Sequence, residues 1–326
     1  MSIESLLEKL LAGDRTAISE ALNLVDDHRS AQRESALELL DRLSAQEGST
    51  RAHVVGFTGA PGAGKSSLLN ALVESLREAS ARVGIIAVDP SSQRSGGALL
   101  GDRMRLSASA REAGVFLRSM AARERLGGLA DATRASTVVL CASFDWVFIE
   151  TVGIGQSECE VAQLVDTLVF VAQPGAGDTI QFMKAGILEL PDLFVVNKAD
   201  TGAAAQRTRT ELSGALALAE ASAAPGWKPP LLSASARDRI GIDEIRDQIE
   251  AHGRQSRESG EFARRRKEGQ LAFATESLLR RYGDWGLSQI GGSSRIAQRL
   301  EEAGSRSAFG IVLDLGREIE VALGQG

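Results

Sequence analysis

The hydrophobic positions of this chain change their spacing twice. Between residues 3 and 44 the apolar side chains recur at helical intervals, as Leu6, Leu10 and Ile18 illustrate, and this spacing predicts two or three short helices. After residue 50 the apolar residues instead form short continuous runs rich in Val, Ile and Phe: HVVGFTG, RVGIIAVD, GVFLRSM, FDWVFIET, DTLVFVAQ, DLFVVNKAD and PPLLSAS. From about residue 241 the helical spacing returns.

The continuous runs predict strands that are buried on both faces. Helical stretches separate most of them, so the pattern indicates an α/β fold, a three-layer sandwich in which helices cover both faces of a mainly parallel sheet. We expect a helical N-terminal extension over 1–50, the α/β domain over 51–253 and a helical C-terminal region over 254–326. The C-terminal spacing predicts helices near 241–253, 258–281, 293–303 and 307–324.

The most specific motif is GAPGAGKSS, which follows the first apolar run and precedes a helical stretch. This context and spacing are those of a P-loop, in which glycines let backbone N–H groups converge on phosphate oxygens at a helix N-terminus. Lys65 would then meet the β and γ phosphates as a catalytic cation, and the Ser66 hydroxyl would ligate Mg²⁺. A tight glycine turn with a surface lysine is the alternative. The expected nucleotide-binding residues are Gly59, Ala60, Pro61, Gly62, Ala63, Gly64, Lys65, Ser66 and Ser67.

A second motif, FVVNKAD, is a candidate for recognising the base of the nucleotide. An Asp200 carboxylate offers two acceptors to the N1–H and N2–H₂ groups of guanine, whereas adenine lacks both donors. The stem of Lys198 can cover the base while Asn197 ties the loop to the P-loop. A polar turn at the end of a strand is the alternative. The motif SASAR ends the next run, and backbone donors of Ser235, Ala236 and Arg237 would complete a guanine pocket, which indicates GTP and GDP as the ligands.

Three acidic residues are candidates for the metal side of this site. Glu150 ends a run and is followed by Gly153, whose amide would sense the γ-phosphate. We expect Asp89 to end a strand beside the P-loop strand, and Asp102 to follow it within a glycine-rich stretch at a switch position, so that both can reach Mg²⁺ or the attacking water. The alternatives are a helix cap for Glu150 or Asp102 and an Asx turn for Asp89.

Composition narrows the classes of partner and compartment. With 37 basic and 43 acidic residues, the chain has a net charge of −6, which favours neither nucleic acid nor an anionic membrane as partner. Two cysteines cannot form a disulfide framework, and the N-terminus does not resemble a signal peptide, so we expect a cytoplasmic protein. His28, His53 and His252 are isolated in the sequence, and we expect none of them to be a ligand or a catalytic group.

Taken in order, GAPGAGKSS, AVDPSSQRSGGALLGDRMR, LGGLA, IETVGIGQSE, QPGAGDTIQFMKAGI and VNKAD resemble the MeaB/ArgK family of methylmalonyl-CoA mutase accessory GTPases. The resemblance implies a slow, homodimeric P-loop GTPase whose C-terminal region, 254–326, serves dimerisation. By the same resemblance, the protein is expected to bind an adenosylcobalamin-dependent acyl-CoA mutase, to gate loading of its cofactor and to protect or reactivate the mutase. It also implies that Ser66, Asp89, Asp102 and Glu150 surround Mg²⁺, and that residues 173–186 form an additional switch. Glu124 and Arg125 depart from the glycine-histidine pair common in the family.

Two other functions fit part of the sequence. A nickel-insertion GTPase usually carries a His-rich or Cys-rich tract, which three histidines and two cysteines do not supply. A P-loop kinase would have no use for the guanine motif. The sequence therefore favours the mutase-associated GTPase.

Overall fold

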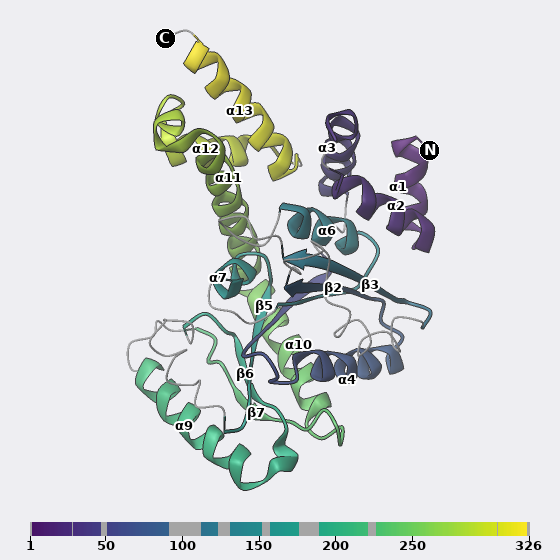
Figure 1. Ribbon diagram of the computed structural model, residues 1–326, viewed down its shortest axis with the longest axis vertical. Helices are drawn as coiled ribbons and strands as arrows, with labels where there is room; N and C mark the ends of the chain where they lie inside the picture. The colour runs from purple at the N-terminus through teal and green to yellow at the C-terminus, as the bar shows by residue number, and fades with distance from the viewer. Residues whose placement is uncertain are drawn as a thin grey trace. The chain divides into compact units, whose positions relative to one another are not determined.

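The structure is a computed structural model that describes residues 2–27, 29–46, 51–90, 112–122, 131–151, 157–175, 189–220, 226–304 and 306–324 (Figure 1). The chain divides into two compact units. The first unit contains Met1–Arg51, Ala135–Ser143 and Ala263–Gly326, and the second contains Ala52–Arg134 and Phe144–Phe262. Both ends of the chain thus belong to one unit, while our three-part division by residue number stays a prediction.

The second unit is built on one seven-stranded parallel sheet of order β3-β2-β4-β1-β5-β6-β7. Each of the predicted apolar runs contains one of these strands, which confirms the α/β prediction. The strands are β1 (His53–Thr58), β2 (Val83–Pro90), β3 (Val115–Ala122), β4 (Trp146–Glu150), β5 (Thr167–Ala172), β6 (Leu193–Val196) and β7 (Leu231–Ser233).

β2, which contains Asp89 and ends at Pro90, does not lie beside the P-loop strand, so the expectation that it would is wrong. β2 pairs with β3 and with β4, and β4 separates it from β1. The reason is that a parallel crossover can skip a place in the sheet, which a later strand then fills, and the order of strands along the chain does not reveal this. The backbone of Asp89 pairs with Ala121, whereas its side chain lies outside the described residues.

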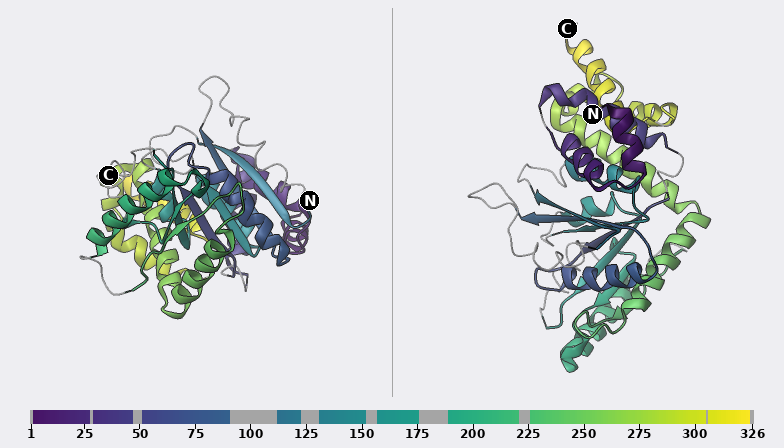
Figure 2. Two further views of the ribbon diagram at one scale, coloured as in Figure 1. Left: turned by 90° about the horizontal axis from the view of Figure 1, so that it is seen from below. Right: turned by 90° about the vertical axis from the view of Figure 1, so that its right-hand side faces the viewer.

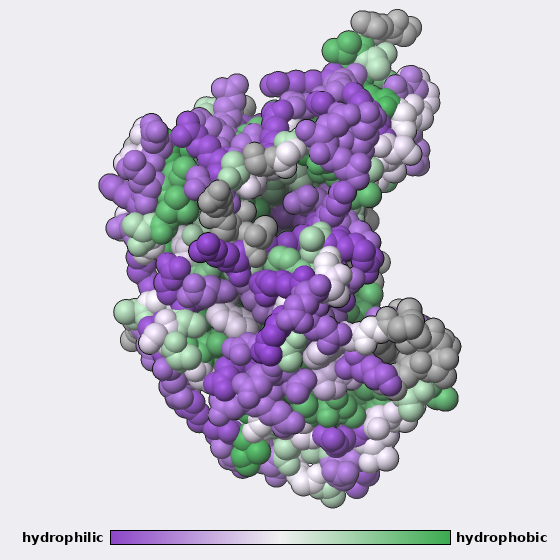
Figure 3. Space-filling model, turned by 180° about the vertical axis from the view of Figure 1, so that it is seen from behind, coloured by the Kyte–Doolittle hydropathy of each residue, from purple (hydrophilic) through white to green (hydrophobic). Residues whose placement is uncertain are grey.

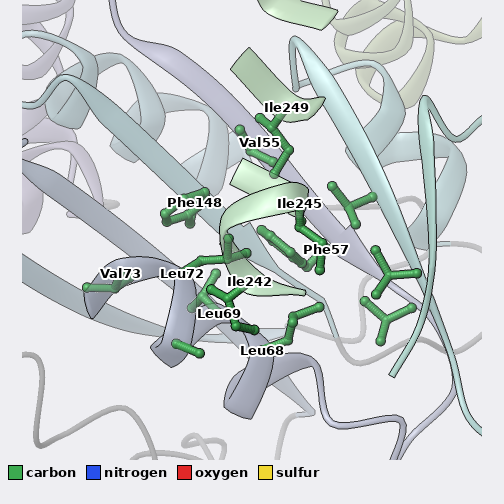
Figure 4. Packing of buried hydrophobic residues seen from close by; sticks show 14 of the residues in the cluster. Val55, Phe57, Leu68, Leu69, Leu72, Val73, Phe148, Ile242, Ile245 and Ile249 are labelled. Carbon is green, nitrogen blue, oxygen red and sulfur yellow. The ribbon is translucent and has the colours of Figure 1, made fainter. Parts of the chain in front are cut away.

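One face of the sheet is covered by α4 (Lys65–Glu78) and α10 (Ile242–Glu258), and the right-hand view of Figure 2 shows α4 along this face. Alternate residues of the strands point toward these helices because side chains of a strand alternate between its faces. Figure 4 shows the resulting core, in which Val55 and Phe57 of β1 meet Leu72 of α4 and Ile245 of α10. All four side chains are buried.

The opposite face is covered by α7 (Ser157–Ala162) and α9 (Ala203–Glu220). α7 approaches β1 closely because Gly56 has no side chain: a Cβ built there would lie 2.6 Å from Val161 Cγ1. α9 packs farther along the sheet, where Leu212 joins Phe170 and Phe194 in a separate buried cluster. The sheet is therefore dry on both faces, as its continuous apolar runs predicted.

The first unit is helical throughout its described residues. Its N-terminal helices are α1 (Ile3–Leu11), α2 (Arg15–Val25) and α3 (Ser30–Ser44), and it also includes part of α6 (Asp131–Cys141). Its C-terminal helices are α11 (Glu261–Ser288), α12 (Gly292–Glu302) and α13 (Ala308–Gly324). Asp41 of α3 joins the two ends, because its carboxylate accepts a hydrogen bond from the Ser307 backbone N–H at 3.0 Å, immediately before α13.

Two of the histidines are not isolated in space. His53 Nε2 and His252 Nδ1 each lie 2.7 Å from the Thr167 hydroxyl oxygen, and His252 Nε2 lies 3.3 Å from Asp192 Oδ1. All four side chains are buried at the amino ends of β1, β5 and β6, under α10. The spacing of the two histidines in the sequence does not reveal this cluster, because they come together only in the folded chain. His28 lies outside the described residues.

No described helix is long and apolar enough to cross a membrane. Figure 3 shows one face of the molecule, on which hydrophilic residues predominate and hydrophobic residues form small separate patches. That surface agrees with a chain in which 25% of the residues are charged.

Truncation of Ile245, the buried residue by which α10 packs on the sheet, should destabilise the second unit. Ile245 is fully buried in the core, so Ile245→Ala removes buried methylene groups and leaves a cavity. We expect the free energy of unfolding to fall by about 2–5 kcal/mol, measured by urea denaturation. Ile240→Ala is the matched control because Ile240 is 59% exposed, and it should change that free energy by about 0.5 kcal/mol or less. Equal losses in the two variants would contradict the packing of α10 on the sheet.

Candidate functional site

The P-loop leaves the carboxyl end of β1 and turns back into α4 through three glycines with positive φ: Gly59 (+134°), Gly62 (+81°) and Gly64 (+88°). A left-handed backbone is strained for any residue with a Cβ, so this path favours glycine. Gly59 also touches β5 directly, since a Cβ there would lie 2.1 Å from the Val171 carbonyl oxygen. Gly64 is the N-cap of α4, which aims the amino end of that helix at the loop.

Lys65 is buried, and its ammonium group turns back over the loop. Its Nζ donates hydrogen bonds to the carbonyl oxygens of Gly59 at 2.7 Å and Ala60 at 3.1 Å. A buried charge is tolerated only with such partners. The lysine therefore places a cation inside the loop, where backbone amides and the helix N-terminus already favour an anion. Pro61, Gly62 and Ser67 are exposed at the same loop, while Ala60 and Ala63 are buried.

The Ser66 hydroxyl donates a hydrogen bond of 2.5 Å to Glu150 Oε1, and both side chains are buried. The contact exists because β4 pairs directly with β1, which brings the end of β4 beside the start of α4. A hydroxyl and a carboxylate are hard oxygen donors of the kind that Mg²⁺ prefers. Asp102 and Gly153 lie outside the described residues.

Asn197 connects the loop after β6 to the P-loop. Its Nδ2 donates to the carbonyl oxygens of Ala63 at 3.0 Å and Gly64 at 3.3 Å. Its Oδ1 accepts from the backbone N–H of Ala236 at 3.3 Å, in the loop after β7. The side chain is buried, and it joins three loops at one edge of the sheet.

Lys198 and Asp200 lie in the same loop as Asn197. Lys198 adopts a left-handed backbone with φ of +56°, and its Nζ donates to the Gly62 carbonyl oxygen at 2.7 Å. The long stem of this side chain therefore runs toward the P-loop. Asp200 belongs to the short 3₁₀ helix η3 (Ala199–Thr201), and its Oδ1 accepts from the Ser235 hydroxyl at 2.9 Å. The loop after β6, with Asp200, and the loop after β7, with Ser235, thus lie side by side, as the predicted guanine pocket requires.

Two residues at this edge were missed by the sequence analysis. Asp238 Oδ1 accepts a hydrogen bond from Arg237 Nε at 3.0 Å, next to the SASAR motif. The position of Asp238 three residues after Ser235, suited to a side-chain turn, was the available signal. Gln173 follows β5 and lies over the P-loop, since a Cβ built at Gly62 would lie 3.2 Å from its Oε1. Gln173 opens the 173–186 segment that the resemblance assigns to a switch, but no local pattern predicts that its side chain lies over the P-loop.

Within the described ranges, no group of three or more His, Cys, Asp or Glu side chains is arranged to hold a metal ion. The Ser66 and Glu150 pair is smaller than such a group. The side chain of Asp89 and the whole of Asp102 lie outside these ranges.

The family model described as methylmalonyl Co-A mutase-associated GTPase MeaB matches residues 18–282, which is more than half of the chain. The chain belongs to the MeaB family. This membership confirms the predicted resemblance, and it makes the chain a P-loop GTPase that binds guanine nucleotide and hydrolyses GTP.

Relatives of the MeaB-family chain come from distant organisms. A protein of Pyrococcus horikoshii that carries the name GTPase is 43% identical over 267 residues, which cover 81% of this chain and 82% of that protein. The mitochondrial methylmalonic aciduria type A homolog of Mus musculus is 36% identical over 81% of this chain and 66% of its own length. The crystal structure of a LAO/AO transport system kinase shares the fold, with a TM-score of 0.70, 24% identity and 98% coverage of both chains.

The close approach at Gly59 predicts a sharp loss of nucleotide binding on substitution. Gly59→Ala would force a Cβ against the Val171 carbonyl and hold alanine at a φ of +134°. Strain and overpacking of about 1–3 kcal/mol each should weaken GDP binding at least about tenfold, measured by titration with a fluorescent GDP analogue. Gly260→Ala is the control because Gly260 also has positive φ, +79°, but no atom within 4 Å of its Cβ position. Normal GDP binding by Gly59→Ala would show that nucleotide binding does not depend on the close contact between Gly59 and the Val171 carbonyl.

Proposed function

We propose that this MeaB-family GTPase binds an adenosylcobalamin-dependent acyl-CoA mutase, of the methylmalonyl-CoA mutase type, and gates the loading of its cofactor. The observation that carries the proposal is the family itself, whose description names association with methylmalonyl Co-A mutase. The mouse relative, whose name refers to methylmalonic aciduria, supports the same class of partner. We further propose that the protein acts as a cytoplasmic homodimer and uses neither nucleic acid nor a membrane as partner.

The nucleotide is proposed to lie along the carboxyl edge of the sheet. Its phosphates would take the backbone amides of the P-loop, and the Lys65 ammonium would leave the Gly59 and Ala60 carbonyls for the β and γ phosphates. The base would lie against the Lys198 stem. Asp200 would then accept from guanine, while backbone donors of the 235–237 loop complete the pocket.

The proposed metal is Mg²⁺, and the buried pair of oxygen donors fits it. Ser66 would be a direct ligand, and Glu150, which is hydrogen-bonded to it, would hold the metal's water. When bound, Mg²⁺ neutralises charge on the β and γ phosphates. Asp89 and Asp102 stay predictions as further acids of this group, with Asp89 assigned to the catalytic step. The Gly153 amide stays a predicted sensor of the γ-phosphate.

The proposed role of Asp200 can be tested by removing its charge alone. Asp200→Asn retains the size of the side chain but replaces one acceptor oxygen by an N–H donor that opposes guanine N2–H₂. Loss of a hydrogen bond to a charged group, about 1.5–3 kcal/mol, should weaken GTP binding roughly 10–100-fold. XTP, whose base presents a carbonyl at C2, should bind this variant better than it binds the wild type. Competition titrations with GTP, XTP and ATP measure this, and tighter binding of ATP than GTP by the wild type would refute the guanine assignment.

The mutase partnership can be tested with the purified proteins. The GTPase loaded with a non-hydrolysable GTP analogue should form a stable complex with a methylmalonyl-CoA mutase on size-exclusion chromatography, because the switch segments differ with the γ-phosphate. The GDP-loaded protein is the matched control and should form less complex. Equilibrium dialysis against Ni²⁺ addresses the nickel-insertion alternative, for which we expect no stoichiometric binding. Stoichiometric Ni²⁺ binding without any mutase complex would overturn the proposal.

A further inference from the structure

The Arg237 guanidinium lies between two carboxylates. Its Nη1 is 3.3 Å from Asp200 Oδ2, while its Nε is 3.0 Å from Asp238 Oδ1 and its Nη2 is 3.4 Å from Asp238 Oδ2. The arginine side chain is 74% exposed, whereas the Asp200 side chain is only 16% exposed. An exposed surface cation thus reaches the carboxylate that we assign to guanine.

The Ser235 hydroxyl has the same choice of partner. Its oxygen lies 2.9 Å from Asp200 Oδ1 and 3.2 Å from Asp238 Oδ2, and it accepts the Asp238 backbone N–H at 3.1 Å. A hydroxyl has one hydrogen, so it donates a full hydrogen bond to only one of the two carboxylates at a time. The backbone contact keeps the hydroxyl in reach of both.

Both oxygens of Asp200 are therefore in contact with groups of the protein itself. Guanine needs both of them, one for N1–H and one for N2–H₂. Each carboxylate oxygen has two lone pairs, so the Ser235 hydroxyl can stay beside the base, whereas the larger Arg237 guanidinium, whose second partner is Asp238, competes for Oδ2. We propose that Asp238 is a positioning residue for guanine selection: it draws the Arg237 guanidinium away, which leaves the Asp200 carboxylate to the base. This proposal rests on the proposed role of Asp200.

The charges favour such an exchange. The hydrogen bond from Arg237 lowers the pKa of Asp238, and the hydrogen bond to Asp238, followed by the charge of Asp200, raises the pKa of Arg237. Arg237 and Asp238 thus each favour the charged form of the other. Because exposed ion pairs are individually weak, the guanidinium can leave one carboxylate for the other at little cost.

The decisive variant is Asp238→Asn, which retains the shape of the side chain but not its charge. Arg237 should then remain on Asp200 and compete with guanine. We expect the KM for GTP to rise about 3–10-fold with kcat unchanged, since the competition affects binding of the base and not the phosphates. ITP is the matched ligand because its base lacks the 2-amino group and leaves one Asp200 oxygen to Arg237. Its KM should rise less than about twofold.

A second substitution separates competition from damage to the loop. Arg237→Gln in the Asp238→Asn background removes the competing cation, and the KM for GTP should return to within about twofold of the wild type. Equal losses for GTP and ITP, or no recovery in the double variant, would show that Asp238 only shapes the loop and would overturn the proposal. An unchanged KM for GTP in Asp238→Asn would overturn it too.

Failure of this proposal is distinguishable from failure of the guanine assignment. If Asp200→Asn retains the wild-type preference for GTP over XTP, the assignment of Asp200 is wrong and the role of Asp238 falls with it. If Asp200→Asn changes the preference as expected but Asp238→Asn behaves as the wild type, only the role of Asp238 is wrong.

Discussion

One side-chain amide holds the nucleotide site together. Asn197 is buried, and its two kinds of polar atom reach the P-loop on one side and the loop after β7 on the other. The loops that it joins arise from three different strands. The loops after β6 and β7 also share a backbone hydrogen bond, from the Ala199 N–H to the Ala234 carbonyl oxygen at 2.9 Å. A buried amide with lost partners carries a penalty of about 1–3 kcal/mol, so the three loops are stable mainly as a set.

The site consists of polar groups at the carboxyl ends of strands whose faces are covered by apolar side chains. Lys65 and Glu150 are charged and buried, and each is accommodated by oxygen or hydroxyl groups of the same edge rather than by solvent. The parallel sheet makes this possible because the carboxyl ends of β1, β4 and β6 meet there, while their apolar bodies pack between helices. Glycines at the turn allow its left-handed backbone without the strain that a Cβ would add.

Much of the fold could be predicted because its signals are local. Each strand is a continuous apolar run, and the P-loop and guanine motifs occupy consecutive residues, so pattern alone located Lys65 and Asp200. The sheet order could not be predicted in the same way, because nothing near Asp89 records that β4 will lie between β2 and β1. The contacts of Asp238 and the position of Gln173 over the P-loop could not be predicted, because both depend on loops that meet only after folding.

The buried cluster at the other edge of the sheet has a further consequence. Thr167 contacts a ring nitrogen of His53 and another of His252 through a single hydroxyl, which carries a single hydrogen. If that hydrogen points to one imidazole, the other imidazole must present an N–H. The two histidines, 114 and 85 positions from Thr167 in the sequence, therefore have interdependent tautomers. The direction of one hydrogen thus couples the hydrogen positions of two rings, one on the strand that leads to the P-loop and one on the helix that begins after the 235–237 loop.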